Sequence, residues 1–313
     1  MSTNSKAFEI SRKRFRIHPI QSSFTRCFQT IKPKILVQPL VKSTFPAQES
    51  CCDKISENTH QLKFDIVESL KNSILEQDSS RVDQHFQQLI CLDSPWLLEA
   101  VPNIPWKELD NDSFEICCQI LISKVDLTNE VFVCFLKELV LSQLLKEGPL
   151  NRGLDVLISA IVAARPHASL SGLILPLLAS SYMDKVKADM ICTIMMNSFG
   201  PSLHDEFLKK VFVRIEQDPV ALHEPIIVVL QSSLKLIDQQ SIGTDTVNTI
   251  TSVLASESSK QPKSLLIANL ILTFITRAKE KLETSHRSIF QGALEKNKSH
   301  LKRIILKEIS KIN

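Results

Sequence analysis

Apolar side chains recur three and four residues apart almost without interruption from residue 60 to residue 313. This is the period of an amphipathic or buried helix, and we find no alternating pattern that would predict a β-strand. The first such segment, 60–77, carries an apolar residue at every fourth position: Leu62, Ile66, Leu70 and Ile74. The pattern predicts further helices at 81–91, 96–101, 113–124, 129–146, 151–164, 169–179, 184–197, 202–217, 219–236, 245–256, 263–281, 285–293 and 298–312.

Several of these helices are preceded by residues that commonly cap a helix start. Asp110 and Thr128 stand where a side-chain oxygen can accept a hydrogen bond from the first turn. Ser202 and Asp205 resemble a capping box with a shortened acid. Asp218 is followed by proline, which suits the first position of a helix and predicts a start there.

Helices of this length, joined by short breaks, stack antiparallel and bury their apolar faces on one another. The predicted starts repeat as pairs about every 35 to 45 residues, in the range of HEAT-like repeats. We therefore expect an all-α fold, an irregular antiparallel helical-repeat solenoid of the HEAT or ARM type, over residues 59–313. A compact helical bundle is the alternative.

Residues 1–58 have a different composition and are predicted to form a disordered basic arm. Residues 1–45 hold nine Lys or Arg and one acid, whereas the remaining 268 residues hold 28 bases and 33 acids. The compact basic cluster comprises Arg12, Lys13, Arg14 and Arg16. It is a candidate nuclear localisation signal; a nucleic-acid contact, a mitochondrial presequence and an unselected tail are the other interpretations.

Composition narrows the class of protein further. Six glycines in 313 residues favour helices over turn-rich β structure, and a single tyrosine argues against base-stacking surfaces. Most of the eight cysteines lie in apolar runs, which suits free thiols in a reducing compartment. Leu154–Leu178 is the most apolar stretch, but charged residues interrupt it, so we expect a nuclear or cytosolic protein without a membrane span.

Catalytic signatures are missing from the sequence. It contains no glycine-rich phosphate loop, no His-Glu-x-x-His and no Gly-x-Ser-x-Gly. The adjacent Cys117 and Cys118 are more typical of buried thiols than of a metal site, and Gly172 of a close-packing position. We expect solvated side chains at His204, His286 and His300. No catalytic, cofactor-binding or metal-binding residue is predicted.

The segment 298–312 has the most informative surface. A helical wheel places Leu301, Ile304, Ile305, Ile309 and Ile312 on one face. The opposite face is basic and offers a docking surface for an acidic partner or a phosphate backbone. The alternative is a polar cap that keeps the end of the array soluble. The candidate partner-binding residues are His300, Leu301, Lys302, Arg303, Leu306 and Lys307.

The order of segments over residues 90–313 resembles the C-terminal domain of the Fanconi anaemia group E family. The apolar helix at Leu265–Arg277 is followed by Leu-Glu-Thr-Ser-His-Arg, Ala-Leu-Glu-Lys-Asn and a closing Leu-Lys-Arg-Ile-Ile-Leu-Lys. Upstream, Leu154–Leu178 and Val228–Leu234 resemble the middle helices of that family. The ordered set carries the resemblance, because none of the segments is diagnostic alone.

The resemblance implies a helical-repeat adaptor that is not an enzyme. It implies a subunit of the nuclear Fanconi anaemia core ubiquitin-ligase complex, acting in DNA interstrand crosslink repair. The implied partners are the group C protein, the group D2 substrate, which is monoubiquitinated, and other core-complex subunits. The closing repeat is where the resemblance implies substrate contact. The chain departs from the family there, with His300-Leu301 in place of Phe-Leu. It also has only about 58 residues before the repeats, where vertebrate members have a long N-terminal region.

Two other functions stay open from the residues alone. One is a nucleic-acid-binding helical repeat that uses the arm and the basic closing helix, and the other is a general protein-interaction scaffold. The mildly acidic helical region and the scarcity of aromatic residues argue against direct DNA binding.

Overall fold

The computed structural model describes residues 52–146, 152–217 and 222–312, and every regular element in these ranges is helical. Their all-α structure confirms the class predicted from the apolar spacing. The first helix, α1 (Cys52–Leu75), begins eight residues before the predicted start at residue 60. The segment 52–59 has only two apolar residues, so periodicity gives no signal there. Cys51–Asn313 forms one compact unit, which begins earlier than the expected boundary at 58/59.

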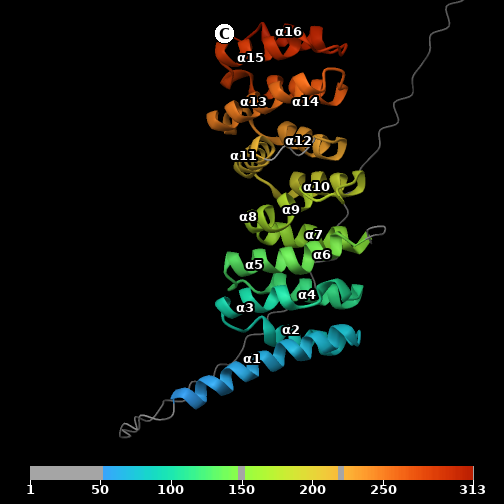
Figure 1. Ribbon diagram of the computed structural model, residues 1–313, viewed down its shortest axis with the longest axis vertical. Coiled ribbons are helices and arrows are strands. Elements are labelled where there is room, and N and C mark those ends of the chain that lie inside the picture. The colour runs from blue at the N-terminus through green and yellow to red at the C-terminus, as the bar shows by residue number, and fades with distance from the viewer. Residues whose placement is uncertain (1–51, 147–151, 218–221, 313) are drawn as a thin grey trace, which may run out of the picture. The chain divides into compact units, whose positions relative to one another are not determined.

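The helices are arranged in two layers of successive neighbours (Figure 1). In the first layer, each helix packs on the next helix of the same layer. The members of this layer are α2 (Ser79–Leu89), α4 (Asn111–Ser123), α7 (Arg152–Ala164), α10 (Lys185–Ser198), α12 (Glu224–Leu236), α14 (Leu265–Ala278) and α16 (Lys302–Ile309). Helix α1 packs on α2 and opens the series.

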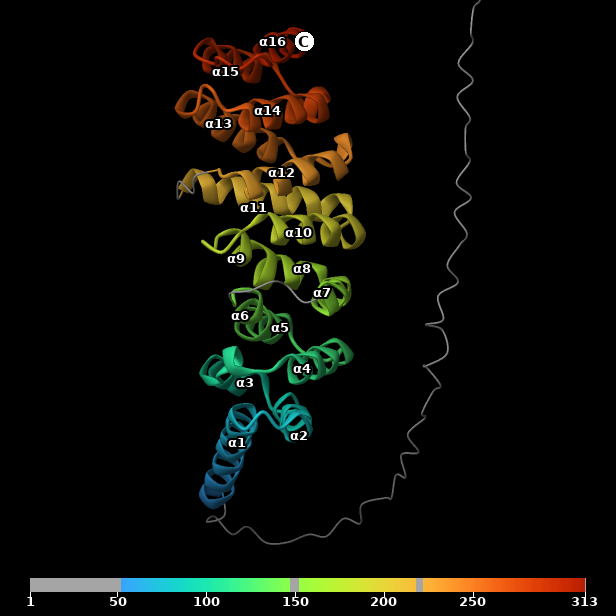
Figure 2. The same cartoon turned by 90° about the vertical axis from the view of Figure 1, so that its right-hand side faces the viewer.

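The second layer alternates with the first along the chain (Figure 2). Its members are α3 (Ser94–Ala100), the continuous α5 (Asn129–Phe135), η4 (Leu136–Val140) and α6 (Leu141–Leu144), the continuous α8 (Pro166–Ser169), η5 (Leu170–Ile174) and α9 (Leu175–Leu178), then α11 (Pro201–Gln217), α13 (Thr244–Lys260) and α15 (Thr284–Glu295). Short 3-10 turns at Val101–Asn103, Trp106–Glu108, Gln239–Ser241 and Lys279–Lys281 complete the connections. This arrangement is the helical-repeat solenoid that the sequence predicts.

Several polar contacts between successive repeats join residues that are 37 to 39 positions apart in the chain. The side chains of Gln143 and Arg165 donate to backbone carbonyls 37 and 38 residues earlier in the chain. His286 meets Asn248 across 38 residues, and Asn297 meets Ser258 across 39. One structural repeat is therefore about 38 residues long, which agrees with the predicted interval of 35 to 45 residues.

Two predicted helix starts are confirmed at the level of single hydrogen bonds. The Asp110 carboxylate accepts from the backbone N–H of Ser113 at 2.9 Å, so it caps α4. The Thr128 hydroxyl accepts from the N–H of Val131 at 3.4 Å and caps α5. These caps satisfy donors that the first helical turn leaves without a partner, which is why they are readable from sequence.

Two other predictions about helix starts are corrected by the structure. Helix α11 begins at Pro201, one residue before the predicted start, but Asp205 does not close a capping box on Ser202. Its carboxylate accepts instead from the backbone N–H of Gly243, 38 residues later, at the start of α13. Helix α12 begins at Glu224 and not after Asp218, which lies outside the described residues. Glu224 is followed by a proline at the position where proline suits a helix start.

Gly172 lies at a close approach between two helices. The helix predicted at 169–179 starts three residues earlier, at Pro166, and passes through the π-helical segment η5. The preceding helix contains the matching π-helical segment η4, and the two segments pack together. A Cβ on Gly172 would stand 3.0 Å from the Leu136 Cβ and 3.1 Å from the Val133 Cα. This confirms the predicted close-packing role of Gly172.

Candidate docking surfaces

Helix α16, which spans most of the predicted closing helix, packs one face against α14 and α15. Ile305, Ile309 and Ile312 are buried in that contact, as predicted. Leu301 and Leu306 are half-buried and belong to the same core. These two residues were candidate partner contacts, and the structure gives them a packing role.

Ile304 was expected on the buried face, and that expectation is wrong, because 47% of its surface is exposed. It lies about 100° around the helix axis from the buried Ile305. The neighbouring helices α14 and α15 cover only one side of α16, and Ile304 falls outside that side. Sequence periodicity could not reveal this, since the width of the covered face depends on the packing partners.

The outward face of this helix is basic. His300, Arg303 and Lys307 are exposed, and their side chains have no hydrogen bond or ion pair with any described residue. Lys302 differs, because its ammonium group donates to the backbone carbonyl of Glu295 at 2.8 Å. It therefore satisfies a carbonyl at the C-terminal end of α15 and is less free to bind a partner.

Glu308 does not cancel this charge. Its carboxylate pairs with the ammonium of Lys311 at 2.6 Å. The hydrogen bond from Lys311 lowers the pKa of Glu308, and the positive charges of Lys311, Lys279 and Lys307 act in the same direction. Glu308 is thus a single negative charge among three lysines, Lys279, Lys307 and Lys311, so this part of the surface keeps a net positive charge. We refer to Lys279, His300, Arg303, Ile304 and Lys307 as the closing basic surface.

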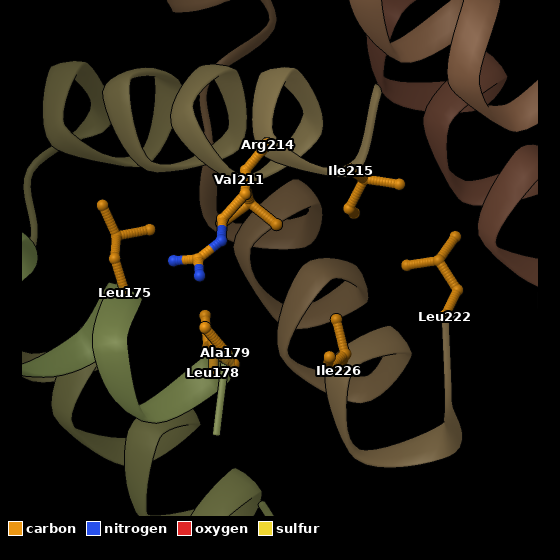
Figure 3. Close-up of a pocket in the computed structure, with 8 residues that line it drawn as sticks. All are labelled: Leu175, Leu178, Ala179, Val211, Arg214, Ile215, Leu222 and Ile226. Atoms are coloured by element: carbon orange, nitrogen blue, oxygen red, sulfur yellow. The ribbon is translucent and has the colours of Figure 1, made fainter. Parts of the chain in front are cut away.

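A second feature was not predicted from the sequence. An apolar cavity of about 30 Å³ lies between α9, α11 and α12 (Figure 3). Aliphatic side chains form nearly all of its wall, and the one charged residue is Arg214 of α11. The lining residues are Leu175, Leu178, Ala179, Val211, Arg214, Ile215, Leu222 and Ile226.

Arg214 extends across this cavity rather than away from it. Figure 3 shows its guanidinium group directed toward Leu178 and Ala179 of the preceding repeat. No carboxylate or carbonyl among the described residues pairs with it. The residue is exposed to solvent, so the guanidinium stands at the mouth of an otherwise apolar space.

Two histidines expected on polar faces are buried instead. His204 is 1% exposed, and its Nδ1 lies 2.9 Å from the Ser233 hydroxyl oxygen. Burial lowers the pKa of His204 to about 4, so this ring is neutral at pH 7. His286 Nδ1 accepts from the backbone N–H of Glu283, and its Nε2 lies 2.7 Å from the Asn248 side-chain oxygen. Both rings are structural groups between helices.

The described residues contain no cluster of side chains suited to binding a metal ion. No group of three or more His, Cys, Asp or Glu side chains is placed to hold a metal ion in this part of the chain. Burial raises the pKa of the Cys117 and Cys118 thiols far above the ordinary value. A protonated, buried thiol is a poor nucleophile. These two residues act as small core side chains.

No single described helix is long and apolar enough to span a membrane. The helices at Gly153–Ala164 and Pro166–Leu178 reach the required length and composition only as a pair, with a bend of 119° between them. The predicted nuclear localisation cluster, Arg12, Lys13, Arg14 and Arg16, lies outside the described residues.

The sequence matches no model of a known protein family and no curated protein.

Proposed function

We propose that this chain is a non-enzymatic adaptor of the nuclear Fanconi anaemia core ubiquitin-ligase complex. In this proposal it binds the group C protein and recruits the group D2 protein for monoubiquitination during DNA interstrand crosslink repair. The support from sequence is the ordered resemblance to the group E family over residues 90–313. The segments that carry its end correspond to α14, α15 and α16, which are consecutive helices of the array.

The closing basic surface is the observation that carries the proposal. Arg303 and Lys307 are exposed and free of partners among the described residues, and the exposed Ile304 lies on the same helix between them. A protein interface commonly combines an apolar anchor with charged groups that steer the encounter. This helix is also the one that the resemblance implies for substrate contact. An acidic partner segment with an apolar side chain would complement it.

The first experiment tests pairing with the group C protein. We expect the full chain and a group C protein, expressed together, to elute from size-exclusion chromatography as a one-to-one complex. Separate elution of two well-folded proteins would contradict this part of the proposal.

The second experiment tests the surface itself. Exchanging both Arg303→Glu and Lys307→Glu should weaken capture of group D2 protein by about tenfold or more, since charge-assisted contacts are lost and repulsion is added. The matched control exchanges the exposed Lys235→Glu and Lys263→Glu, which makes the same change in net charge away from the surface. Equal loss in both variants would show that net charge alone, and not this surface, governs binding.

Direct DNA binding is a second candidate function. It is favoured by the same basic side chains, Arg303 and Lys307, which have no ion-pair partner among the described residues. It predicts an affinity for duplex DNA that falls steeply as salt rises, because bound counterions are released. Removing Arg303 and Lys307 should then reduce the salt slope by about 2. If the chain is an adaptor without DNA affinity, the unaltered chain should show no salt-dependent binding to duplex DNA. Fluorescence anisotropy of labelled duplex across a salt series separates the two functions.

A further inference from the structure

The seam between α9 and α11 differs from the other seams in the second layer. Helices α11 and α13 pack closely along their backbones, as do α13 and α15. Helices α9 and α11 stand further apart, and the apolar cavity occupies the space between them. Most of the cavity wall is buried, whereas Leu175 and Ala179 are half-buried and Arg214 is exposed.

One end of this seam is closed by polar contacts. His167 Nδ1 lies 3.1 Å from the Glu206 carboxylate, which also pairs with the Lys210 ammonium at 2.7 Å. Lys210 reaches back to the Ser171 hydroxyl at 3.4 Å. These contacts join the start of the α8–η5–α9 helix to the middle of α11. No such polar bridge joins the described residues at the other end, where Arg214 stands.

The open end offers two chemically distinct elements side by side. The cavity wall is aliphatic, so water inside it would find few hydrogen-bonding partners. The Arg214 guanidinium at its mouth has five N–H donors and no acceptor among the described residues. A carboxylate is the group that a guanidinium binds best, through two parallel hydrogen bonds.

We infer that the seam between α9 and α11 is a docking site for an acidic segment of a partner protein. An apolar side chain of that segment enters the cavity, and an adjacent Asp or Glu pairs with Arg214. This site is separate from the closing basic surface and does not depend on the function proposed for it.

The size of the cavity favours a peptide segment over a small molecule. Pockets that enclose a ligand of drug size measure about 300 to 1,000 Å³, whereas this cavity is about 30 Å³. It holds the tip of one side chain, so most contacts must come from the surface around it. A shallow groove along α11 supplies that surface, lined by Glu206, Lys209, Lys210, Val213, Arg214 and Gln217.

The charged groups on that groove are not all available. Lys210 is engaged by Glu206, and Lys209 lies 3.5 Å from Asp245. Arg214 is therefore the cation of this groove that is free to pair with a ligand, within the part of the chain that the structure describes. This singles out one residue for the test.

The test uses the full chain with labelled isoleucine methyl groups, observed by NMR. The probe is the peptide acetyl-Gly-Glu-Leu-Glu-Gly-amide at millimolar concentration. We expect it to shift the methyl resonances of Ile215 and Ile226, which line the cavity. The same peptide with lysines for glutamates, or with serine for leucine, should leave these resonances unchanged. Octanoate serves as a small alkyl carboxylate for comparison.

Two variants separate the charge from the cavity. Arg214→Glu should weaken peptide binding about tenfold or more, through loss of a charge-assisted pair. Ala179→Leu should also weaken it, by filling the cavity while keeping the guanidinium. Lys263→Glu is the control for net charge and should bind as the unaltered chain does. Because Arg214 is exposed, its exchange leaves the core intact.

The proposal is overturned if the acidic peptide leaves both isoleucines unshifted. Equal binding by the lysine peptide, or unchanged binding by Arg214→Glu, overturns it as well. A shift produced by octanoate and not by the peptide would assign the cavity to small alkyl carboxylates, and would also reject a protein segment as its occupant.

Discussion

Adding a single methyl group at Gly172 tests how tightly successive repeats are packed. In Gly172→Ala, the new Cβ would lie 3.0 Å from the Leu136 Cβ and 3.1 Å from the Val133 Cα. Separations this short are below ordinary van der Waals contact for carbon atoms. The Val133 atom belongs to the backbone of a helix, so it cannot move away by a side-chain rotation. The two π-helical segments must separate to admit the methyl group.

The expected cost follows from two opposing terms. Overpacking a close-packed contact destabilises a protein by about 1 to 3 kcal/mol. Replacing glycine by alanine within a helix recovers up to about 1 kcal/mol. We therefore expect Gly172→Ala to lower the free energy of unfolding by up to about 2 kcal/mol, and to be less stable than a glycine-to-alanine exchange without this contact.

Gly292 provides a matched control, because it lies within α15 and a Cβ there would meet nothing within 4 Å. Gly292→Ala should raise stability by about 0.5 to 1 kcal/mol through the helix term alone. Urea unfolding followed by circular dichroism measures both variants, and amide hydrogen exchange over η4 and η5 locates the loss. If Gly172→Ala is as stable as Gly292→Ala, the close approach of these helices does not limit packing.

Three further predictions concern polar groups between repeats. The Arg165 guanidinium donates to the carbonyls of Lys124, Val125 and Leu127 and stacks on the Phe132 ring. A single ammonium group cannot make all of these contacts, so Arg165→Lys should lower the free energy of unfolding in urea by about 2 to 3 kcal/mol. An unchanged unfolding midpoint would refute this. The pKa of His204 falls from 6.5 to about 4 on folding, so the unfolded chain binds the extra proton and stability is lost as pH falls below 6.5. About 2 kcal/mol should disappear between pH 7 and pH 5, and His204→Asn should flatten that dependence; a variant with the original slope would assign it to other groups. Asp205→Ala should cost about 1 kcal/mol and increase hydrogen exchange at the start of α13, where the carboxylate binds the Gly243 N–H; unchanged exchange there would contradict a cross-repeat cap.

The sequence predicted which face of the closing helix is basic, but not which of its residues pack in the core. The position of the basic face on the closing helix was predicted from sequence, and Arg303 and Lys307 are exposed there. The roles of Leu301 and Leu306 in the core depend on how far α14 and α15 extend over α16. A helical wheel assigns directions around one axis, but it does not say how much of the circle a neighbour covers.

The Arg214 cavity had no recognisable signal in the sequence. Its walls come from residues 175–179 and, about one repeat later in the chain, from 211–215 and 222–226. The helical parts of these segments read as ordinary apolar helix faces. The only hint is a charged residue close to the apolar stripe of α11, which is common on amphipathic helices and predicts nothing by itself. The spacing of α9 from α11 is a property of the assembled array.

The sequence by itself determined that the chain is helical, where caps such as Asp110 and Thr128 start helices, and that pairs of helices repeat about every 35 to 45 residues. These properties depend on hydrogen bonds and apolar spacing within a few residues. Only the tertiary structure decided that His204 is buried, that Asp205 caps a helix in the next repeat, and that Ile304 is exposed. Each of these outcomes depends on a partner about one repeat away or on how far a neighbouring helix reaches, and local sequence carries no record of either.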